Sequence, residues 1–120
     1  MKEILIIDDD ADLLQAWKLR FEAAGGFLVK TAQRGADAIK VVENKIPNLI
    51  ITDVIMPDMD GYTTLREINK ITEKKVPVIV MTGKAVMTKD AFEMEGARAF
   101  LLKPVDGNQL LQKAKELLGD

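Results

Sequence analysis

The sequence predicts an α/β fold in which a single five-stranded parallel sheet carries helices on both faces. Short apolar runs alternate five times with segments whose apolar residues recur at helical spacing, which is typical of a doubly wound sheet. The run Leu49-Ile50-Ile51-Thr52 has no polar alternation, so we expect a strand that is buried on both faces. A chain of 120 residues has the size of one domain, and we expect residues 1–120 to form it.

The first strand and helix follow directly from the N-terminus. Residues 4–7 are all apolar, and this run ends on Asp8-Asp9-Asp10. Asp10 is expected to cap the next helix, because a carboxylate there accepts hydrogen bonds from free backbone N–H groups and favours the positive helix end. Gly25-Gly26 ends the helix. The apolar residues expected on its inner face are Leu14, Trp17, Phe21 and Ala24.

The second strand and second helix give weaker signals. Residues 27–32 mix apolar and polar side chains, which predicts a strand near an edge of the sheet. A short helix follows before Pro47, with Ala36, Ile39 and either Val42 or Glu43 on its stripe. The buried strand that ends at Asp53 comes next, and Pro57 breaks the chain after it.

Turn residues open the second half of the chain. The segment Asp58-Met59-Asp60-Gly61 is turn chemistry, and Asp60 or its neighbour is expected to cap a helix. Residues 77–82 form the fourth strand, in which Pro77 is acceptable only as an early residue because it has no N–H to donate. The residues expected to face inward from the helix between them are Leu65, Ile68 and Ile71.

The last third of the chain contains the weakest and the clearest helix. Residues 84–95 form the weak one, which Gly96 stops, and residues 99–103 form a fifth strand that Pro104 breaks. The last helix is capped by Asp106 at its start and by Gly119 at its end. The weak helix has a loose stripe of Met87, Ala91 and Met94, and the last helix has a stripe of Leu110, Leu111, Ala114, Leu117 and Leu118.

The composition excludes several classes of protein. Hydrophobic residues make up 48% of the chain and charged residues 30%, which is typical of globular proteins and not of disordered chains. Because cysteine and histidine are absent, disulfides, zinc sites and a histidine general base are excluded. The net charge of -2 provides no general attraction to nucleic acid or to anionic membranes. No signal peptide and no spanning run of about 20 apolar residues is present, so a cytoplasmic location is the default expectation.

Three aspartates are expected to meet at one edge of the sheet. Five strands that alternate with helices imply right-handed crossovers, and the flavodoxin-like (βα)5 strand order 2-1-3-4-5 fits the chain best. The first and third strands are then neighbours, so Asp8, Asp9 and Asp53 converge at the carboxyl edge, where open α/β sheets bind ligands. Taken alone, Asp53 is equally well explained as a turn residue that ends a strand.

A natural fold rarely brings three carboxylates together without a cation or shared protons. Two carboxylates about 4 Å apart repel each other by roughly 4 kcal/mol at an effective dielectric of about 20. Hard oxygen ligands in a chain without histidine or thiol favour Mg²⁺ as the cofactor. The alternative is a solvated acidic rim without an ion.

A hydroxyl group and an ammonium group are expected at the same edge. Thr82 ends the fourth strand and Lys103 ends the fifth. Each is ordinary by itself, since threonine is common in strands and a terminal lysine is usually solvated. Together with Mg²⁺ they can bind the equatorial oxygens of a phosphoryl group on Asp53, and phosphoryl transfer is mostly catalysed in this way.

Across essentially its whole length the sequence resembles the receiver (CheY-like) domains of bacterial two-component response regulators. The resemblance implies a phosphoacceptor signalling domain in which Asp53 takes a phosphoryl group from a phosphohistidine of a histidine kinase or phosphotransfer protein. A downstream effector protein or domain would be its other partner, with no direct binding of nucleic acid or membrane. Such a domain catalyses its own phosphorylation and dephosphorylation and is not a conventional turnover enzyme. The matching residues, in chain order, are Asp8-Asp9, Asp53 with Met56-Pro57 and Asp60-Gly61 after it, Thr82-Gly83, and Lys103-Pro104.

The resemblance also implies a set of metal ligands. Asp9 and Asp53 would bind Mg²⁺ together with the backbone carbonyl of Ile55, and Asp8 would act largely through water. Ile55 and Lys84 occupy positions that in this family tune how fast the acyl phosphate hydrolyses. An apolar residue and a flexible cation at these positions leave the lifetime of the phosphate open.

The same resemblance implies a switch. Thr82 and Lys103 would bind the phosphoryl oxygens, and Gly83 is small enough to admit the group. Phe100 occupies the aromatic switch position, which moves inward as Thr82 shifts toward the phosphate. The surface formed by the fourth helix, the fifth strand and the last helix would change as a result. The alternative for Phe100 is an ordinary aromatic residue on an edge strand.

The Lys103-Pro104 bond is expected to be cis. Proline lowers the cost of a cis bond to about 0.5 to 1 kcal/mol, and the loop must turn Lys103 back over the acidic edge. The resemblance points the same way. The bonds Ile46-Pro47, Met56-Pro57 and Val76-Pro77 are expected to be trans.

Three other functions are weighed against this one. A magnesium-dependent phosphatase of the haloacid dehalogenase type also uses an aspartyl nucleophile with Thr and Lys, but its nucleophile lies on the first strand. A flavodoxin-like FMN carrier requires a Ser/Thr/Gly-rich phosphate loop after the first strand, where this chain has three acids. A non-phosphorylated pseudo-receiver that only binds partners would not be expected to keep all five site residues.

Overall fold

The strands of the protein form one parallel sheet, as the sequence predicts. The structure is a computed structural model that describes residues 1–53, 61–83 and 89–119. Within these residues the strand order is β2-β1-β3-β4-β5, which is the expected order, and β2 lies at an edge. The strands are β1 (Lys2–Ile7), β2 (Phe27–Ala32), β3 (Leu49–Asp53), β4 (Val78–Thr82) and β5 (Ala97–Leu102).

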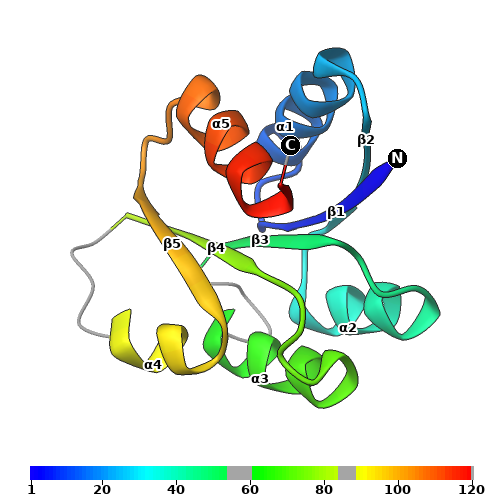
Figure 1. The fold of residues 1–120 in the computed structure, drawn as a ribbon, viewed down its shortest axis with the longest axis vertical. Coiled ribbons are helices and arrows are strands. Elements are labelled where there is room, and N and C mark those ends of the chain that lie inside the picture. Colours follow the sequence, from blue (N-terminus) through cyan, green and yellow to red (C-terminus); the bar gives the residue numbers. More distant parts are fainter. Residues whose placement is uncertain (54–60, 84–88, 120) are drawn as a thin grey trace.

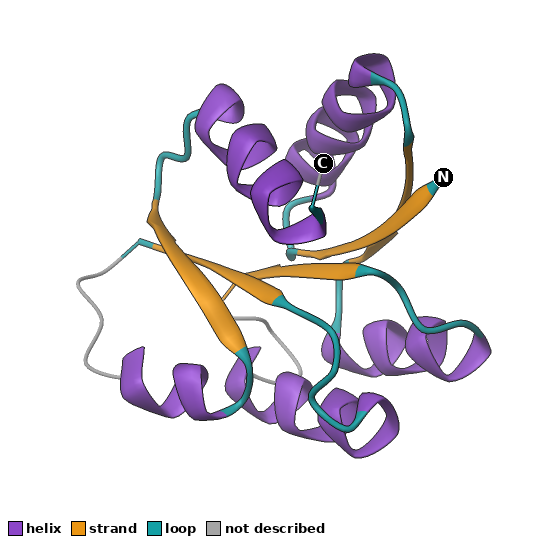
Figure 2. Ribbon diagram, viewed as in Figure 1, coloured by secondary structure: helices purple, strands orange, loops and turns teal. Residues whose placement is uncertain are grey.

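Helices cover both faces of the sheet. Figure 1 shows α1 and α5 on one face and the other three helices on the opposite face, and Figure 2 shows the sheet in orange between these two layers. Two hydrophobic clusters fill the spaces between sheet and helices, because β1, β3 and β4 are buried on both faces. The helices are α1 (Ala11–Ala24), α2 (Gly35–Asn44), α3 (Gly61–Thr72), α4 (Lys89–Met94) and α5 (Gly107–Leu118).

The predicted caps at Asp10, Asp106 and Gly119 are confirmed, whereas the one predicted at Asp60 lies outside the described residues. The Asp10 carboxylate accepts hydrogen bonds from the backbone N–H groups of Asp12 and Leu13 at the start of α1. The Asp106 carboxylate accepts one from Asn108 at the start of α5. Gly119 ends α5 in the left-handed conformation, with φ of 78°, which glycine adopts without steric cost.

Three strands differ from the expectation by one or two residues at their ends. Strand β1 already begins at Lys2. Strand β5 begins at Ala97 and ends at Leu102, so Lys103 follows the strand. Strand β4 begins at Val78, and Pro77 stays outside it, where its carbonyl oxygen accepts a hydrogen bond from Ile50 N–H. Proline serves there because only its acceptor is used.

The inner faces of three helices differ in detail from the predicted stripes. Ala24 is exposed at the end of α1, where the helix has passed the edge of the core. In α2, Ala36, which was expected on the inner face, is exposed, and Ala38 is buried in its place. The inner face is set by Gly35, which is buried at the start of the helix. In α4, Met94 is 75% exposed and Phe92 is the buried residue.

The stripe of α4 was predicted wrongly at Met94 because aromatic packing decides the face. Phe92 is 1% exposed, and its ring makes edge-to-face contacts with two other rings. Its centroid lies 5.5 Å from that of Tyr62 and 6.5 Å from that of Phe100. Met87 lies outside the described residues. Among the described helices, none has the length and apolar character needed to cross a bilayer.

Candidate functional site

The carboxyl ends of β1 and β3 bring the three predicted aspartates together. In the register of these strands Ile7 is paired with Thr52, so the residues that come next, Asp8 and Asp53, are neighbours across the strands. One carboxylate oxygen from each of Asp8, Asp9 and Asp53 lies within 4.8 Å of the others. Asp8 and Asp53 are buried, with residue exposures of 0% and 8%, and Asp9 is exposed. The predicted convergence of the acidic residues is therefore confirmed.

Lys103, in the loop that follows β5, reaches into this cluster. Its Nζ lies 2.8 Å from Asp53 Oδ2 and 3.2 Å from Asp8 Oδ2, so one ammonium group bridges the two buried carboxylates. Its backbone N–H donates to the carbonyl oxygen of Thr82 at 2.8 Å, which ties the loop after β5 to the end of β4.

The proline geometry agrees with the prediction for the described bonds. Lys103-Pro104 is cis, and Ile46-Pro47 and Val76-Pro77 are trans. The Met56-Pro57 bond lies outside the described residues.

Burial dominates the electrostatics of Asp8. Removal of its carboxylate from water raises the pKa of Asp8 above its ordinary value of 3.8, and the charge of Asp53 adds to this rise. The backbone N–H of Asp10, which donates to Asp8 Oδ1 at 3.0 Å, and the ammonium group of Lys103 act in the opposite direction. The folded protein therefore disfavours the ionised form of Asp8 relative to the protonated form.

The pKa of Lys103 lies above its ordinary value of 10.5. Burial is the largest single influence and lowers it, but the hydrogen bond to Asp53 and the charges of Asp8 and Asp53 together raise it by more. The ammonium group is thus charged at neutral pH. Two of the three clustered carboxylates, those of Asp8 and Asp53, share this ammonium group, so the cluster keeps net negative charge. Its hard oxygen atoms suit a divalent ion such as Mg²⁺.

Two further predicted site residues, Thr82 and Phe100, lie on the neighbouring strands β4 and β5. Thr82 is buried at the end of β4, next to Gly83, and a Cβ atom added at Gly83 would meet open space. Ile55 and Lys84 lie outside the described residues. Phe100 is half-buried on β5.

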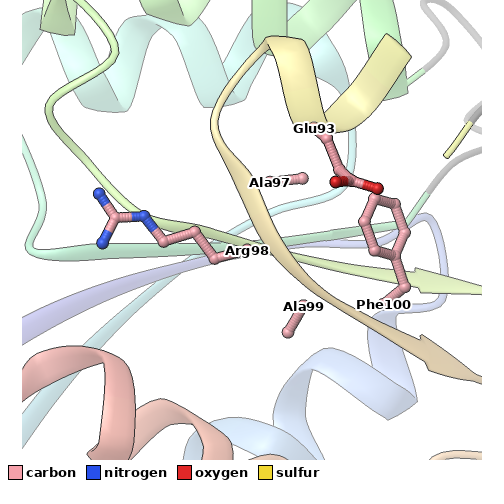
Figure 3. Close-up of a pocket in the computed structure, with 5 residues that line it drawn as sticks. All are labelled: Glu93, Ala97, Arg98, Ala99 and Phe100. Carbon is pink, nitrogen blue, oxygen red and sulfur yellow. The ribbon is translucent and has the colours of Figure 1, made fainter. Parts of the chain in front are cut away.

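Phe100 lines a pocket at the outer edge of the sheet. The pocket has a volume of about 470 Å³, and its other lining residues are Glu93, Ala97, Arg98 and Ala99. In Figure 3 the Glu93 carboxylate lies beside the Phe100 ring, whereas Arg98 extends away from both. The aromatic residue thus connects the buried Phe92 with a surface formed by α4 and β5.

Two features of the site do not follow from the predicted site residues. One is the hydrogen bond from Asp10 N–H to Asp8, for which the only signal is that a third aspartate follows Asp8-Asp9. The other is a pocket of about 530 Å³ beside the carboxylates. Its lining residues are Asp10, Leu13, Trp17, Met81, Lys103, Pro104 and Val105.

A family model and curated relatives match the chain. Residues 4–115 match the model of the response regulator receiver domain. Protein PilH of Pseudomonas aeruginosa is 31% identical over 120 residues, which cover 98% of both chains. The transcriptional regulatory protein GlrR of Escherichia coli is 34% identical over 116 residues, which cover 96% of this chain and only 26% of that protein. The chain therefore spans about a quarter of the length of that regulator.

Solved structures give the same result. A CheY-like receiver domain protein from Methanospirillum hungatei is 34% identical and matches with a TM-score of 0.90, over 99% of this chain and 94% of that one. The chemotaxis protein CheY4 of Vibrio cholerae is 26% identical, with a TM-score of 0.90 over 98% of both chains. No feature of the described site favours the phosphatase, flavin-carrier or pseudo-receiver alternatives. The chain belongs to the receiver domain family of response regulators.

Proposed function

We propose that this domain is a phosphoacceptor that takes a phosphoryl group onto Asp53 from a phosphohistidine of a histidine kinase or phosphotransfer protein. The observation that carries the proposal is the bridge from Lys103 Nζ to Asp53 Oδ2, at 2.8 Å, inside a cluster of three carboxylates at the carboxyl edge of the sheet. A carboxylate oxygen of Asp53 would attack the phosphorus atom. The P–N bond then breaks, the new P–O bond forms, and the histidine nitrogen keeps the electron pair.

The neighbouring side chains of the chain would stabilise the transferred group. Lys103 lies close enough to Asp53 for its ammonium group to bind a phosphoryl oxygen once that oxygen is bonded to Asp53. Thr82, at the end of the adjacent strand β4, would bind a second oxygen through its hydroxyl group. Phosphoryl transfer requires positioning and charge stabilisation more than covalent chemistry, and these two residues supply both.

The carboxylates would hold Mg²⁺, which when bound neutralises charge on the phosphoryl oxygens. Asp9 and Asp53 are the proposed direct ligands with the backbone carbonyl of Ile55, and Asp8 acts largely through water. The described residues support this proposal, because three carboxylate oxygens, one from each acid of the cluster, lie within 4.8 Å of one another. Of the three acids, Asp9 is the exposed one. Clustered acids with one ammonium group fit a divalent ion, because the ion removes the repulsion that remains between them.

Phosphorylation would change the surface formed by α4, β5 and α5. A shift of Thr82 toward the phosphate would let Phe100 move inward, and the contact of Phe100 with Phe92 gives this motion a path to α4. An effector protein or domain would read the changed surface. Ile55 and Lys84 would set the lifetime of the acyl phosphate.

The wider setting of the domain is part of the proposal. Residues 1–120 form one receiver domain that acts in the cytoplasm, catalyses its own phosphorylation and dephosphorylation, and makes no direct contact with nucleic acid or membrane. The match to a quarter of a longer transcriptional regulator and to the full length of PilH is compatible with both an attached and a separate effector.

The experiment that tests the proposal is labelling with acetyl phosphate and Mg²⁺, measured by intact-protein mass spectrometry. We expect one base-labile phosphoryl group on the wild-type protein and none on Asp53→Asn. The matched control is Asp37→Asn, because Asp37 is an exposed aspartate on α2. Equal labelling of Asp53→Asn and the wild-type protein would place the acceptor on another residue.

A further inference from the structure

We propose that Asp10 is a positioning residue of the carboxylate site, and that the cap it forms on α1 holds its backbone N–H against Asp8. The inference rests on the proposed function, because it concerns how the proposed metal site is kept in shape. Asp10 is not proposed as a metal ligand. Its carboxylate is engaged with the helix, and its contact with the site is made through the main chain.

Asp10 connects α1 with the buried acid through four hydrogen bonds. Its Oδ1 accepts from the backbone N–H groups of Asp12 and Leu13, at 3.0 and 3.1 Å. Its carbonyl oxygen accepts from Leu14 N–H at 3.0 Å, which is the first hydrogen bond of the helix. Its own N–H donates to Asp8 Oδ1 at 3.0 Å. The side chain and carbonyl group thus bind the helix, and the N–H binds the site.

This arrangement fixes the rotation of the Asp8 carboxylate. Asp8 is fully buried, with Oδ1 held by Asp10 N–H and Oδ2 held by Lys103 Nζ at 3.2 Å. Each oxygen therefore has its own donor, and the plane of the carboxylate is set by donors on two different segments. Hydrogen bonds to a metal-site carboxylate orient it and influence metal affinity.

Loss of the cap would release the N–H of residue 10. The backbone of Asp10 is extended, with φ of -89° and ψ of 105°, and its side chain and carbonyl oxygen both bond to the first turn of α1. Without the side-chain acceptor, two N–H groups at the start of α1 lose their partner and the first turn frays. Residue 10 is then free to rotate, and its N–H leaves Asp8 Oδ1.

The test compares three variants of Asp10 with one control. Asp10→Ala removes the cap and the charge, whereas Asp10→Asn and Asp10→Ser remove the charge but keep an acceptor of similar capping strength. Asp106→Ala is the matched control, because Asp106 caps α5 on the same face of the sheet (Figure 1) and its carboxylate accepts from Asn108 N–H, at the start of that helix. Thermal unfolding of each variant shows whether Asp10→Ala and Asp106→Ala lower the stability of the protein by similar amounts.

Two measurements on isotope-labelled protein follow by NMR. The first is the affinity for Mg²⁺ alone, from chemical shifts in a titration with MgCl₂. We expect Asp10→Ala to bind about ten times more weakly than the wild-type protein, at the low end of the effect of losing a partner of a metal ligand. Asp10→Asn, Asp10→Ser and Asp106→Ala should bind within about twofold of wild type.

The second measurement uses metal-free protein and reports the exchange of the residue 10 amide hydrogen with solvent. Exchange should be slow in the wild-type protein, Asp10→Asn and Asp10→Ser, and fast in Asp10→Ala. This readout does not depend on metal binding or on phosphorylation. If the wild-type protein does not bind Mg²⁺, the proposed metal site is wrong. The exchange result still decides whether the cap holds the N–H of residue 10 against Asp8.

Three results would overturn the inference. Equal Mg²⁺ affinity and equal amide exchange in Asp10→Ala and wild type would show that the cap is independent of the site. Equal weakening in all three Asp10 variants would show that charge, and not capping, is responsible. A loss of affinity in Asp106→Ala as large as that in Asp10→Ala would reduce the effect to general stability.

Discussion

At the scale of single residues, the site balances buried charges against one shared cation. Asp8 and Asp53 are both buried and both contact Lys103 Nζ, while Asp9 is exposed beside them. Removing one partner of a buried ion pair is costly when the other charge is left unpaired, but Lys103 keeps its pair with Asp53 when Asp8 is neutralised. The stability of the metal-free protein should therefore depend on the ionisation of Asp8.

The first prediction concerns pH and uses Asp8→Asn with EDTA present. Because the folded-state pKa of Asp8 is raised above 3.8, the wild-type protein binds that proton more tightly when folded, and its stability falls as pH rises through the folded pKa. Asp8→Asn lacks this dependence. We expect the free energy of unfolding of Asp8→Asn, relative to that of the wild-type protein, to increase as pH rises from 3.8 toward neutral.

Urea unfolding of both proteins at several pH values measures this difference. Because other carboxylates titrate in both proteins, only the difference between the two curves reports on Asp8. A difference that does not change with pH, or one that decreases as pH rises, would contradict the prediction.

The second prediction concerns Mg²⁺ and Asp9. Mg²⁺ at about ten times its dissociation constant should stabilise the folded protein by roughly 1.4 kcal/mol, which corresponds to a rise in Tm of about 3 to 6 °C. Asp9→Asn should lose most of this rise, because Asp9 is the exposed acid of the cluster and a proposed direct ligand. Asp12→Asn is the control, since Asp12 is an exposed acid in the first turn of α1 outside the cluster. A Tm that stays constant throughout a wide Mg²⁺ titration argues against the site.

The sequence predicts which residues meet at the site, but not how they bond. Asp8, Asp53 and Thr82 each stand at the end of an apolar run, so strand order alone is enough to bring them together. The bridge that Lys103 makes between two carboxylates depends on the path of the loop after β5, which no periodicity encodes. The N–H of Asp10 could not be predicted as a donor to Asp8, because every non-proline residue has one.

At the scale of elements, the helices with strong local signals are predicted well and α4 is not. The caps Asp10 and Asp106 act through neighbours two or three residues away, so they are visible in the sequence. The described part of α4, Lys89–Met94, is less than two turns long, which is too short for a stripe to define a face. Its face is set by Tyr62 from α3 and Phe100 from β5, which are distant in the sequence.

The third prediction compares two substitutions on α4. Phe92→Ala removes a ring that is 1% exposed and packs against two other rings, so it should lower the free energy of unfolding by about 3 kcal/mol. Met94→Ala removes a side chain that is 75% exposed and should change it by less than about 0.5 kcal/mol. Chemical denaturation of both variants provides the measurement. Equal losses would mean that Met94, as its sequence spacing suggested, shares the core-facing side.

At the scale of the whole molecule, the order of the strands connects Asp53 with β4 and β5. The order β2-β1-β3-β4-β5 was predictable because a strand apolar throughout belongs in the centre and a mixed one at an edge. Asp53 and Thr82 lie on adjacent strands, and Lys103 N–H is bonded to Thr82 O at 2.8 Å. Strand β2 meets the site at a different residue, because the carbonyl oxygen of Ala32 accepts from Asp8 N–H at 3.1 Å. A ligand on Asp53 should therefore act on the β4–β5 side of the sheet.

The last prediction tests this asymmetry with beryllofluoride, a phosphoryl mimic, and Mg²⁺. Amide hydrogen exchange measured by mass spectrometry should slow in β5 (Ala97–Leu102) and change in α4, because Thr82 and Lys103 at the ends of β4 and β5 would both bind the mimic and Phe100 packs on Phe92. Exchange in β2 (Phe27–Ala32) should stay the same, because β1 and β3 separate this strand from β4. Asp53→Asn is the control and should show no response at either place. A uniform slowing across β2 and β5 would indicate general stabilisation by ligand, and the sheet would then carry no directed signal toward α4.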